Sequence, residues 1–121
     1  MGLLSRNEIL DIVDLPRETV NVPEWGGDVI VQGLNGTARD QYEIYMNIQR
    51  ASGVSNIKNI RALLVSLCII DSETDKLMFT IDDIPFLEKK SATALDRVFT
   101  IAYRLSGFGQ KEIERLAENL D

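Results

Sequence analysis

The segment that decides the fold is residues 57–70, with the sequence IKNIRALLVSLCII. Apart from Lys58, Asn59 and Arg61 its side chains are almost all apolar, so the segment has no wide face suited to water. A buried strand is conceivable here, but the alanine and the leucines favour a helix. We therefore predict a buried helix at the centre of the protein, with the other elements packed around it.

Catalytic chemistry is poorly represented in this sequence. The only cysteine, Cys68, lies inside the central apolar segment, where a thiol usually packs as a small hydrophobic group. The chain has no histidine, so general acid–base catalysis near neutrality would need a strongly perturbed carboxylate, lysine or thiol. No metal-ligand cluster and no glycine-rich phosphate loop is recognisable. The sequence therefore predicts a protein that is not an enzyme and that holds no cofactor and no metal.

A β-hairpin is predicted ahead of the central helix. Thr19–Val22 alternates polar with apolar residues, and Val29–Gln32 resumes β-type residues after a turn. The turn, residues 23–28 (PEWGGD), supplies a proline with a fixed φ and two glycines that tolerate a positive φ. Trp25 lies near the tip of this hairpin. It either covers the end of the core or is exposed as an anchor for another protein.

A helix is expected between the hairpin and the central helix. Thr37 is the expected N-cap, and the helix follows as Ala38–Ala51. One side carries residues of types that suit both a core and an interface between proteins: Tyr42, Tyr45 and Met46. A second apolar edge is formed by Ile44, Ile48 and Ala51. We expect both faces to be covered, the first by the core or by a partner.

A loop and two further helices are expected after the central helix. Asp71–Lys76 is an acidic loop that lacks the glycine and the final glutamate of a calcium-binding loop. Thr80 is the expected cap of a helix that runs to about Lys90. The next helix, Ala92–Leu105, repeats apolar residues at helical spacing, and Gly107 is its expected C-cap.

Both ends of the chain are also predicted to be helical. Ser5 and Glu8 match the capping-box pattern of a short helix that reaches about Val13. Gln110–Leu120 is expected to form a terminal amphipathic helix with a narrow apolar stripe, which comprises Ile113, Leu116 and Leu120.

These elements predict an α+β fold that is mainly α, with about five helices packed around the central buried helix and one N-terminal β-hairpin. The length of 121 residues suits one domain, in which residues 1–34 hold the first helix and the hairpin and residues 37–121 form the helical part.

Charge and hydropathy restrict the partners of the protein. The formal net charge is −6, so the average surface repels a phosphate backbone, and nucleic acid is not an expected partner. No apolar run approaches the roughly 20 residues that span a bilayer. Residues 1–14 are too charged for a signal peptide. We therefore expect a cytosolic protein with no membrane partner.

The order of the features resembles a known family. The two most specific pieces are Val22–Leu34 (VPEWGGDVIVQGL) and Lys89–Phe99 (KKSATALDRVF). Around them lie the short N-terminal helix, the NGTARDQYE opening of the next helix and the LMFTIDDI stretch. In this order, and over nearly the whole chain, they resemble the tail assembly chaperones of long-tailed bacteriophages of the siphophage type.

The resemblance implies a protein without enzymatic activity that binds the long, largely helical tape measure protein of its phage. Such a chaperone keeps the tape measure protein soluble and helps to recruit the tail tube protein, whose subunits polymerise around it. The implied location is the cytoplasm of the host bacterium, and the protein would be absent from the mature virion. Members of such families often have a second, longer form made by ribosomal frameshifting, which an amino-acid sequence does not reveal.

The resemblance brings no residue-level binding motif, so candidate anchors come from the residues alone. A chaperone for an amphipathic helix needs accessible apolar side chains, and net charge keeps the complex soluble. The candidates for contact with a partner or for self-association are Trp25, the face formed by Tyr42, Tyr45 and Met46, and the stripe formed by Ile113, Leu116 and Leu120.

Two other interpretations stay open. One is another phage morphogenesis or virion structural protein, such as a head–tail joining protein. The other is a small DNA-binding regulator, because residues 105–120 are faintly similar to a helix-turn-helix motif. The second helix of that motif would be rich in glutamate, which phosphates repel.

Overall fold

The computed structural model describes residues 2–51 and 60–108 of the chain. Its elements, in chain order, are α1 (Arg6–Asp11), β1 (Arg17–Val22), the 3-10 turn η1 (Pro23–Trp25), β2 (Gly27–Gln32), α2 (Gly36–Ala51), α3 (Ile60–Cys68), β3 (Ile69–Ile70), the 3-10 turn η2 (Ile81–Asp83), α4 (Ile84–Leu87) and α5 (Ala92–Leu105). Within these residues the fold is α+β and mainly α, which confirms the predicted class.

The strands form one antiparallel sheet in the order β1-β2-β3. β1 and β2 are the predicted hairpin, and Gly26 at its turn has a φ of 75°, in the left-handed region that glycine adopts without steric cost. The alternation of the hairpin places Val22 and Val31 in the core, both with no exposed surface. The sheet is therefore amphipathic, and its apolar side needs a helix to cover it.

The third strand was not predicted. The central helix was expected to reach Ile70, but it ends at Cys68, and Ile69–Ile70 pairs with Ile30 and Val31 of β2. Isoleucine is β-branched and favours strands, and both side chains are buried in the sheet. The helical prediction for the last two residues of this segment was therefore wrong, because the pairing with β2 outweighs local continuation of the helix.

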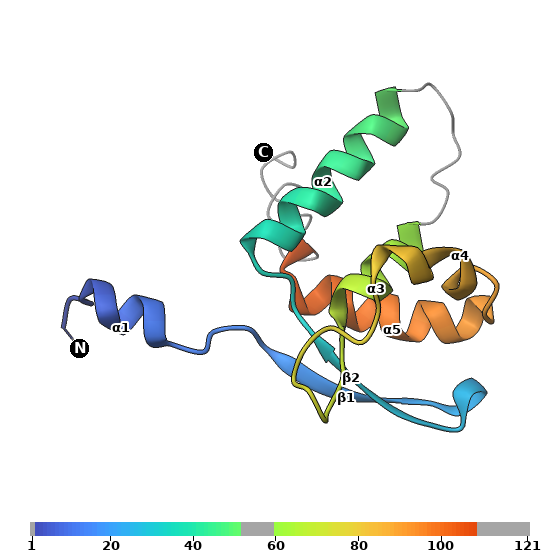
Figure 1. Ribbon diagram of the computed structural model, residues 1–121, viewed down its shortest axis with the longest axis horizontal. Coiled ribbons are helices and arrows are strands. Elements are labelled where there is room, and N and C mark those ends of the chain that lie inside the picture. Colours follow the sequence, from blue (N-terminus) through green and yellow to red (C-terminus); the bar gives the residue numbers. More distant parts are fainter. Residues whose placement is uncertain (1, 52–59, 109–121) are drawn as a thin grey trace, which may run out of the picture.

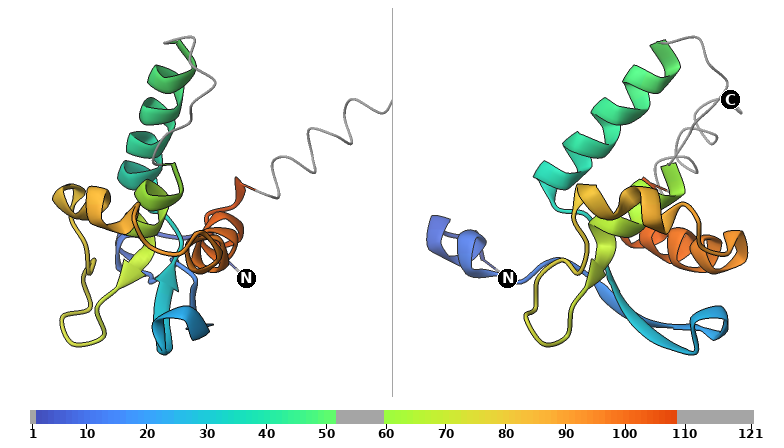
Figure 2. Two further views of the ribbon diagram at one scale, coloured as in Figure 1. Left: turned by 90° about the vertical axis from the view of Figure 1, so that its right-hand side faces the viewer. Right: turned by 45° about the vertical axis from the view of Figure 1, so that its right-hand side comes forward.

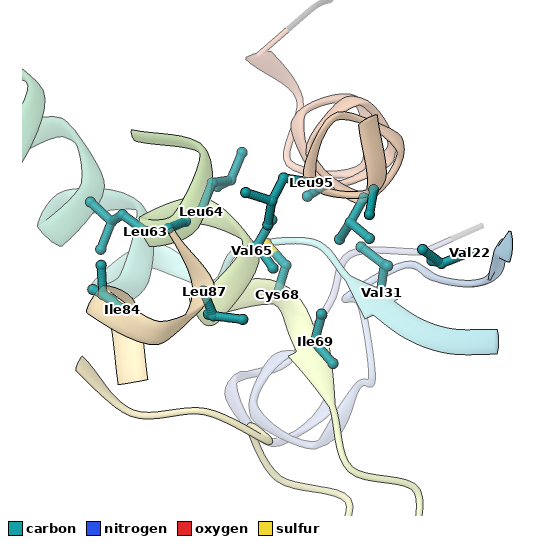
Figure 3. Close-up of a cluster of buried hydrophobic side chains, with 14 of the residues drawn as sticks. Val22, Val31, Leu63, Leu64, Val65, Cys68, Ile69, Ile84, Leu87 and Leu95 are labelled. Atoms are coloured by element: carbon teal, nitrogen blue, oxygen red, sulfur yellow. The ribbon is translucent and has the colours of Figure 1, made fainter. Parts of the chain in front are cut away.

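Helix α3 is the centre of the structure, as predicted. α5 packs against β1 and β2, while α3 lies between α5 and the short α4 (Figure 1). Figure 3 shows side chains of α3 reaching in both directions: Val65 and Cys68 toward Val31 of the sheet, and Leu63 toward Ile84 of α4. One continuous hydrophobic core therefore joins the hairpin to the helices.

Helix starts follow local side-chain chemistry. Ser5 and Glu8 form the predicted capping box at α1, with the Glu8 N–H donating to Ser5 Oγ over 3.2 Å. Thr80 and Asp83 form a second box at η2, where the Thr80 N–H donates to Asp83 Oδ2 over 2.9 Å. The predicted cap Thr37 was wrong. α2 begins earlier, at Gly36, and Asn35 Oδ1 accepts a bond of 2.8 Å from the Ala38 N–H.

Helix ends are also close to prediction. α5 has the predicted bounds, and Gly107 follows it with a φ of 83° and donates its N–H to the Arg104 carbonyl over 3.1 Å. The helix expected after Thr80 is shorter than predicted, because α4 ends at Leu87. Beyond α4 the chain continues in turns that are closed by backbone hydrogen bonds. In the last of these the Lys90 N–H donates to the Leu87 carbonyl over 3.0 Å.

Some predictions lie outside the described residues: the polar break at 52–56, the first residues of the central segment at 57–59, and the terminal helix Gln110–Leu120. The assignment of residues 1–121 to one domain, with parts 1–34 and 37–121, stays a prediction.

Candidate interaction surfaces

Trp25 lies at the hairpin tip and is half-buried against the hydrophobic core. Its neighbour Glu24 accepts a hydrogen bond of 2.9 Å from Arg97 Nε, which ties the tip to α5. The indole N–H of Trp25 is buried and has no hydrogen-bond partner among the described residues. The packing of Trp25 agrees with a side chain that covers the end of the core, and it leaves only part of the ring accessible to another protein.

The face formed by Tyr42, Tyr45 and Met46 turns toward the core. Tyr42 is 4% exposed, and the other two are half-buried against the same cluster. The ring of Phe108, which follows α5, lies 5.3 Å from that of Tyr42 between centroids. Through this contact α2 packs against the residues that follow α5. The third candidate surface, with Ile113, Leu116 and Leu120, lies outside the described residues.

Sequence reasoning missed an aromatic cluster at this junction. Phe108 also lies 4.9 Å from Tyr103 between ring centroids, and Tyr103 lies 5.6 Å from Phe99. The Arg39 guanidinium is 4.4 Å above the Phe108 ring, in the geometry of a cation–π interaction. Phe99 and Tyr103 are four residues apart on one helix, and this spacing predicts their contact. The contact of Phe108 with Tyr42 of α2 joins residues distant in the chain, so no local pattern predicts it.

The apolar side chains that the fold leaves uncovered are elsewhere. Among the described residues twelve large hydrophobic side chains are exposed, and half of them lie in residues 3–13: Leu3, Leu4, Ile9, Leu10, Ile12 and Val13. The rest are Ile44 and Ile48 on the outer edge of α2, and Leu77, Met78, Ile81 and Phe86 between β3 and α4. The prediction that both faces of α2 are covered was therefore wrong for the edge with Ile44 and Ile48.

The N-terminal arm, defined here as residues 2–15, is the least buried part of the described chain. α1 has no buried residue, and Leu3 and Val13 are 101% and 92% exposed. Figure 1 shows α1 standing apart from the body of the protein, at the end of the segment that leads into β1. Figure 2 shows the second projection, α2, which rises away from α3, α4 and α5. Sequence analysis predicted the arm helix but not its isolation.

Several charged side chains form ion pairs between elements of the body. Arg17 Nη1 lies 2.7 Å from Asp75 Oδ1, Arg61 pairs with Asp96, and Arg104 pairs with Glu18. The hydrogen bond from Arg17 lowers the pKa of the Asp75 carboxyl. These pairs are exposed to solvent, so each contributes little to stability by itself.

No catalytic arrangement is visible in the described residues. Burial raises the pKa of the Cys68 thiol to about 12, so the thiolate needed for nucleophilic attack is scarce near neutral pH. Over residues 2–51 and 60–108 there is no group of three or more side chains of the metal-binding types. A search of the same residues finds no helix with the length and apolarity that a membrane crossing requires.

The class of fold becomes clear from comparison with known structures: it is that of a phage tail assembly chaperone. The tail assembly chaperone of bacteriophage HK97 superposes with a TM-score of 0.58, covering 78% of this chain and 85% of that one. The two sequences are 18% identical, so the likeness is one of fold. It confirms at that level the resemblance inferred from the sequence. No family model matches this sequence, and no curated protein matches it either.

Proposed function

We propose that the protein is a tail assembly chaperone, with no enzymatic activity, that binds the tape measure protein of its phage. The observation that carries this proposal is the shared fold with the HK97 tail assembly chaperone over most of both chains. The chaperone binds the tape measure protein before the tail tube exists, keeps it soluble in the host cytoplasm, and helps to recruit the tail tube protein. It then leaves the assembly and is absent from the mature virion.

The described surface is compatible with holding an aggregation-prone helical protein. A net charge of −6 favours solubility of a complex, and exposed apolar side chains provide places for contact. Most of these side chains lie on the N-terminal arm and on α2, which project from the body of the protein. Binding can therefore use them without unfolding the body, where Trp25 and Tyr42 are packed.

Co-expression with the tape measure protein of the same phage tests this function. We expect the tape measure protein to stay in the soluble fraction and to co-purify with the chain, whereas an unrelated acidic protein of similar size leaves it insoluble. A tape measure protein that aggregates equally in both cases contradicts the proposal.

Mass spectrometry of purified virions separates the proposal from the structural-protein alternative. A chaperone should be missing from mature particles while it is abundant in infected cells. A stoichiometric amount of the chain in virions would identify it as a structural component and overturn the proposed role.

A further inference from the structure

The N-terminal arm is built as a docking element. It holds half of the exposed large hydrophobic side chains of the described residues, although it is only a small part of them. These side chains are 54–101% exposed, so folding of the body buries little of their apolar surface. Exposed apolar side chains concentrated in one segment mark a contact site for another molecule.

Within the arm, residues Arg6–Asp11 form the short helix α1. Leu4 and Ile9 occupy the two positions of a hydrophobic staple around the Ser5–Glu8 capping box. At 3.6 residues per turn, Asn7 and Asp11 share the face opposite Ile9. The helix itself has six residues, and isolated helices shorter than about 12 residues are marginal in water. A second helix packed on the apolar side would supply the missing stabilisation.

The charge of the arm indicates what kind of helix would pack on it. Residues 2–15 carry three acidic side chains and one arginine, a net charge of −2. Glu8 is engaged in the cap, while Asp11 and Asp14 have no ion-pair partner among the described residues. A second copy of this chain, with a net charge of −6, repels the arm on average, whereas a stripe flanked by lysine or arginine attracts it.

We propose that the N-terminal arm binds an amphipathic helix of a different protein, one whose apolar stripe is flanked by basic residues. This inference rests on the proposed function, because the bound helix would belong to the tape measure protein. Ile9 and Leu10 provide the apolar contact, and the net charge of −2 on residues 2–15 provides the attraction to the basic flanks.

Two matched double variants test the arm. Ile9→Gln with Leu10→Gln changes side chains that are 54% and 64% exposed, and the control Ile44→Gln with Ile48→Gln changes side chains on α2 that are 58% and 61% exposed. Neither pair is buried, so both variants should fold with an unchanged melting temperature. The probe is a fluorescent synthetic helix of about 20 residues, long enough to be helical, with a leucine stripe flanked by lysines. A second probe has glutamates in place of the lysines.

We expect the wild type and the α2 variant to bind the lysine-flanked helix alike, and the arm variant to bind it at least about tenfold more weakly. The wild type should bind the glutamate-flanked helix at least about tenfold more weakly than the lysine-flanked one. Equal binding by the arm variant and the wild type, or an equal loss in the α2 variant, overturns the proposal. So does an arm variant that loses self-association in sedimentation experiments while it keeps the lysine-flanked helix.

Co-expression with the tape measure protein separates this inference from the function on which it rests. If the wild type does not keep that protein soluble, the proposed function fails, and the result with the synthetic helices still decides whether the arm binds as inferred. If the wild type and the arm variant keep it soluble equally well, the function stands and the inference about the arm is wrong.

Discussion

Replacement of Gly33 by alanine tests the contact that closes the core between β2 and α5. Gly33 follows β2, and a Cβ atom placed on it would lie 2.5 Å from the backbone oxygen of Leu105 and 3.0 Å from its carbonyl carbon. Ordinary contacts begin near 3.4 Å, so the two backbones would have to separate by about 0.9 Å. Both neighbours are main-chain atoms, which cannot rotate away as a side-chain tip could.

The separation would also strain the hydrogen bonds at this junction. The Leu34 N–H donates to Ser106 Oγ over 3.0 Å, and Arg39 Nη1 donates to the Ser106 carbonyl over 3.2 Å. Overpacking of a well-packed site costs about 1–3 kcal/mol. For a chain of this size a loss of about 2 kcal/mol lowers the melting temperature by roughly 8 °C.

Gly36→Ala is the matched control for Gly33→Ala, because a Cβ on Gly36 meets no atom within 4 Å. Gly36 is the first residue of α2, so alanine there should be neutral or stabilise the protein by about 0.4–1 kcal/mol. Urea and thermal unfolding, followed by circular dichroism, measure both variants. If Gly33→Ala melts at the temperature of the wild type, the close approach of Gly33 to Leu105 is refuted.

Three further predictions follow from burial and charge. The Cys68 thiol, with its pKa raised to about 12 and no exposed surface, should not react with thiol reagents at about pH 8 until urea unfolds the protein; rapid labelling of the native state would contradict its burial. The hydrogen bond from Arg97 lowers the pKa of Glu24 from its ordinary value of 4.5, so the stability it adds is present above that pH and is lost as the pH falls through the lowered pKa. Glu24→Gln should therefore flatten the acid side of the stability profile in urea unfolding, and an unchanged profile would show that the pair with Arg97 is not formed. Trp25→Phe should cost less than about 2 kcal/mol, because it keeps an aromatic ring in the core and removes an indole N–H that has no partner among the described residues; a larger loss in urea unfolding would show that this N–H is bonded.

The structure changes where a binding surface should be sought. The sequence suggested Trp25 and the face of Tyr42, Tyr45 and Met46, because their residue types are common in interfaces. In the fold these side chains are partly or fully packed, and half of the exposed large apolar side chains of the described residues lie in the arm. Residue type alone does not distinguish an interface from a core, since both select large apolar and aromatic groups.

Elements that depend on neighbours along the chain were readable from the sequence. The capping box of Ser5 and Glu8, the bounds of α5 and the left-handed Gly107 each rest on interactions within a few residues. The hairpin belongs to the same group, because its turn and its alternation lie in one short stretch. The class of fold followed from these local signals.

Only the tertiary structure decided which apolar faces are covered. Ile69 and Ile70 leave the helical path because β2, nearly 40 residues earlier in the chain, offers them a strand to pair with. Tyr42 is buried while Ile44 is exposed on the same helix, because α3 and Phe108 pack against one side of α2 and no described element covers the other. An apolar pattern shows that a face needs cover, but the cover comes from residues distant in sequence, and their arrangement is a property of the whole fold.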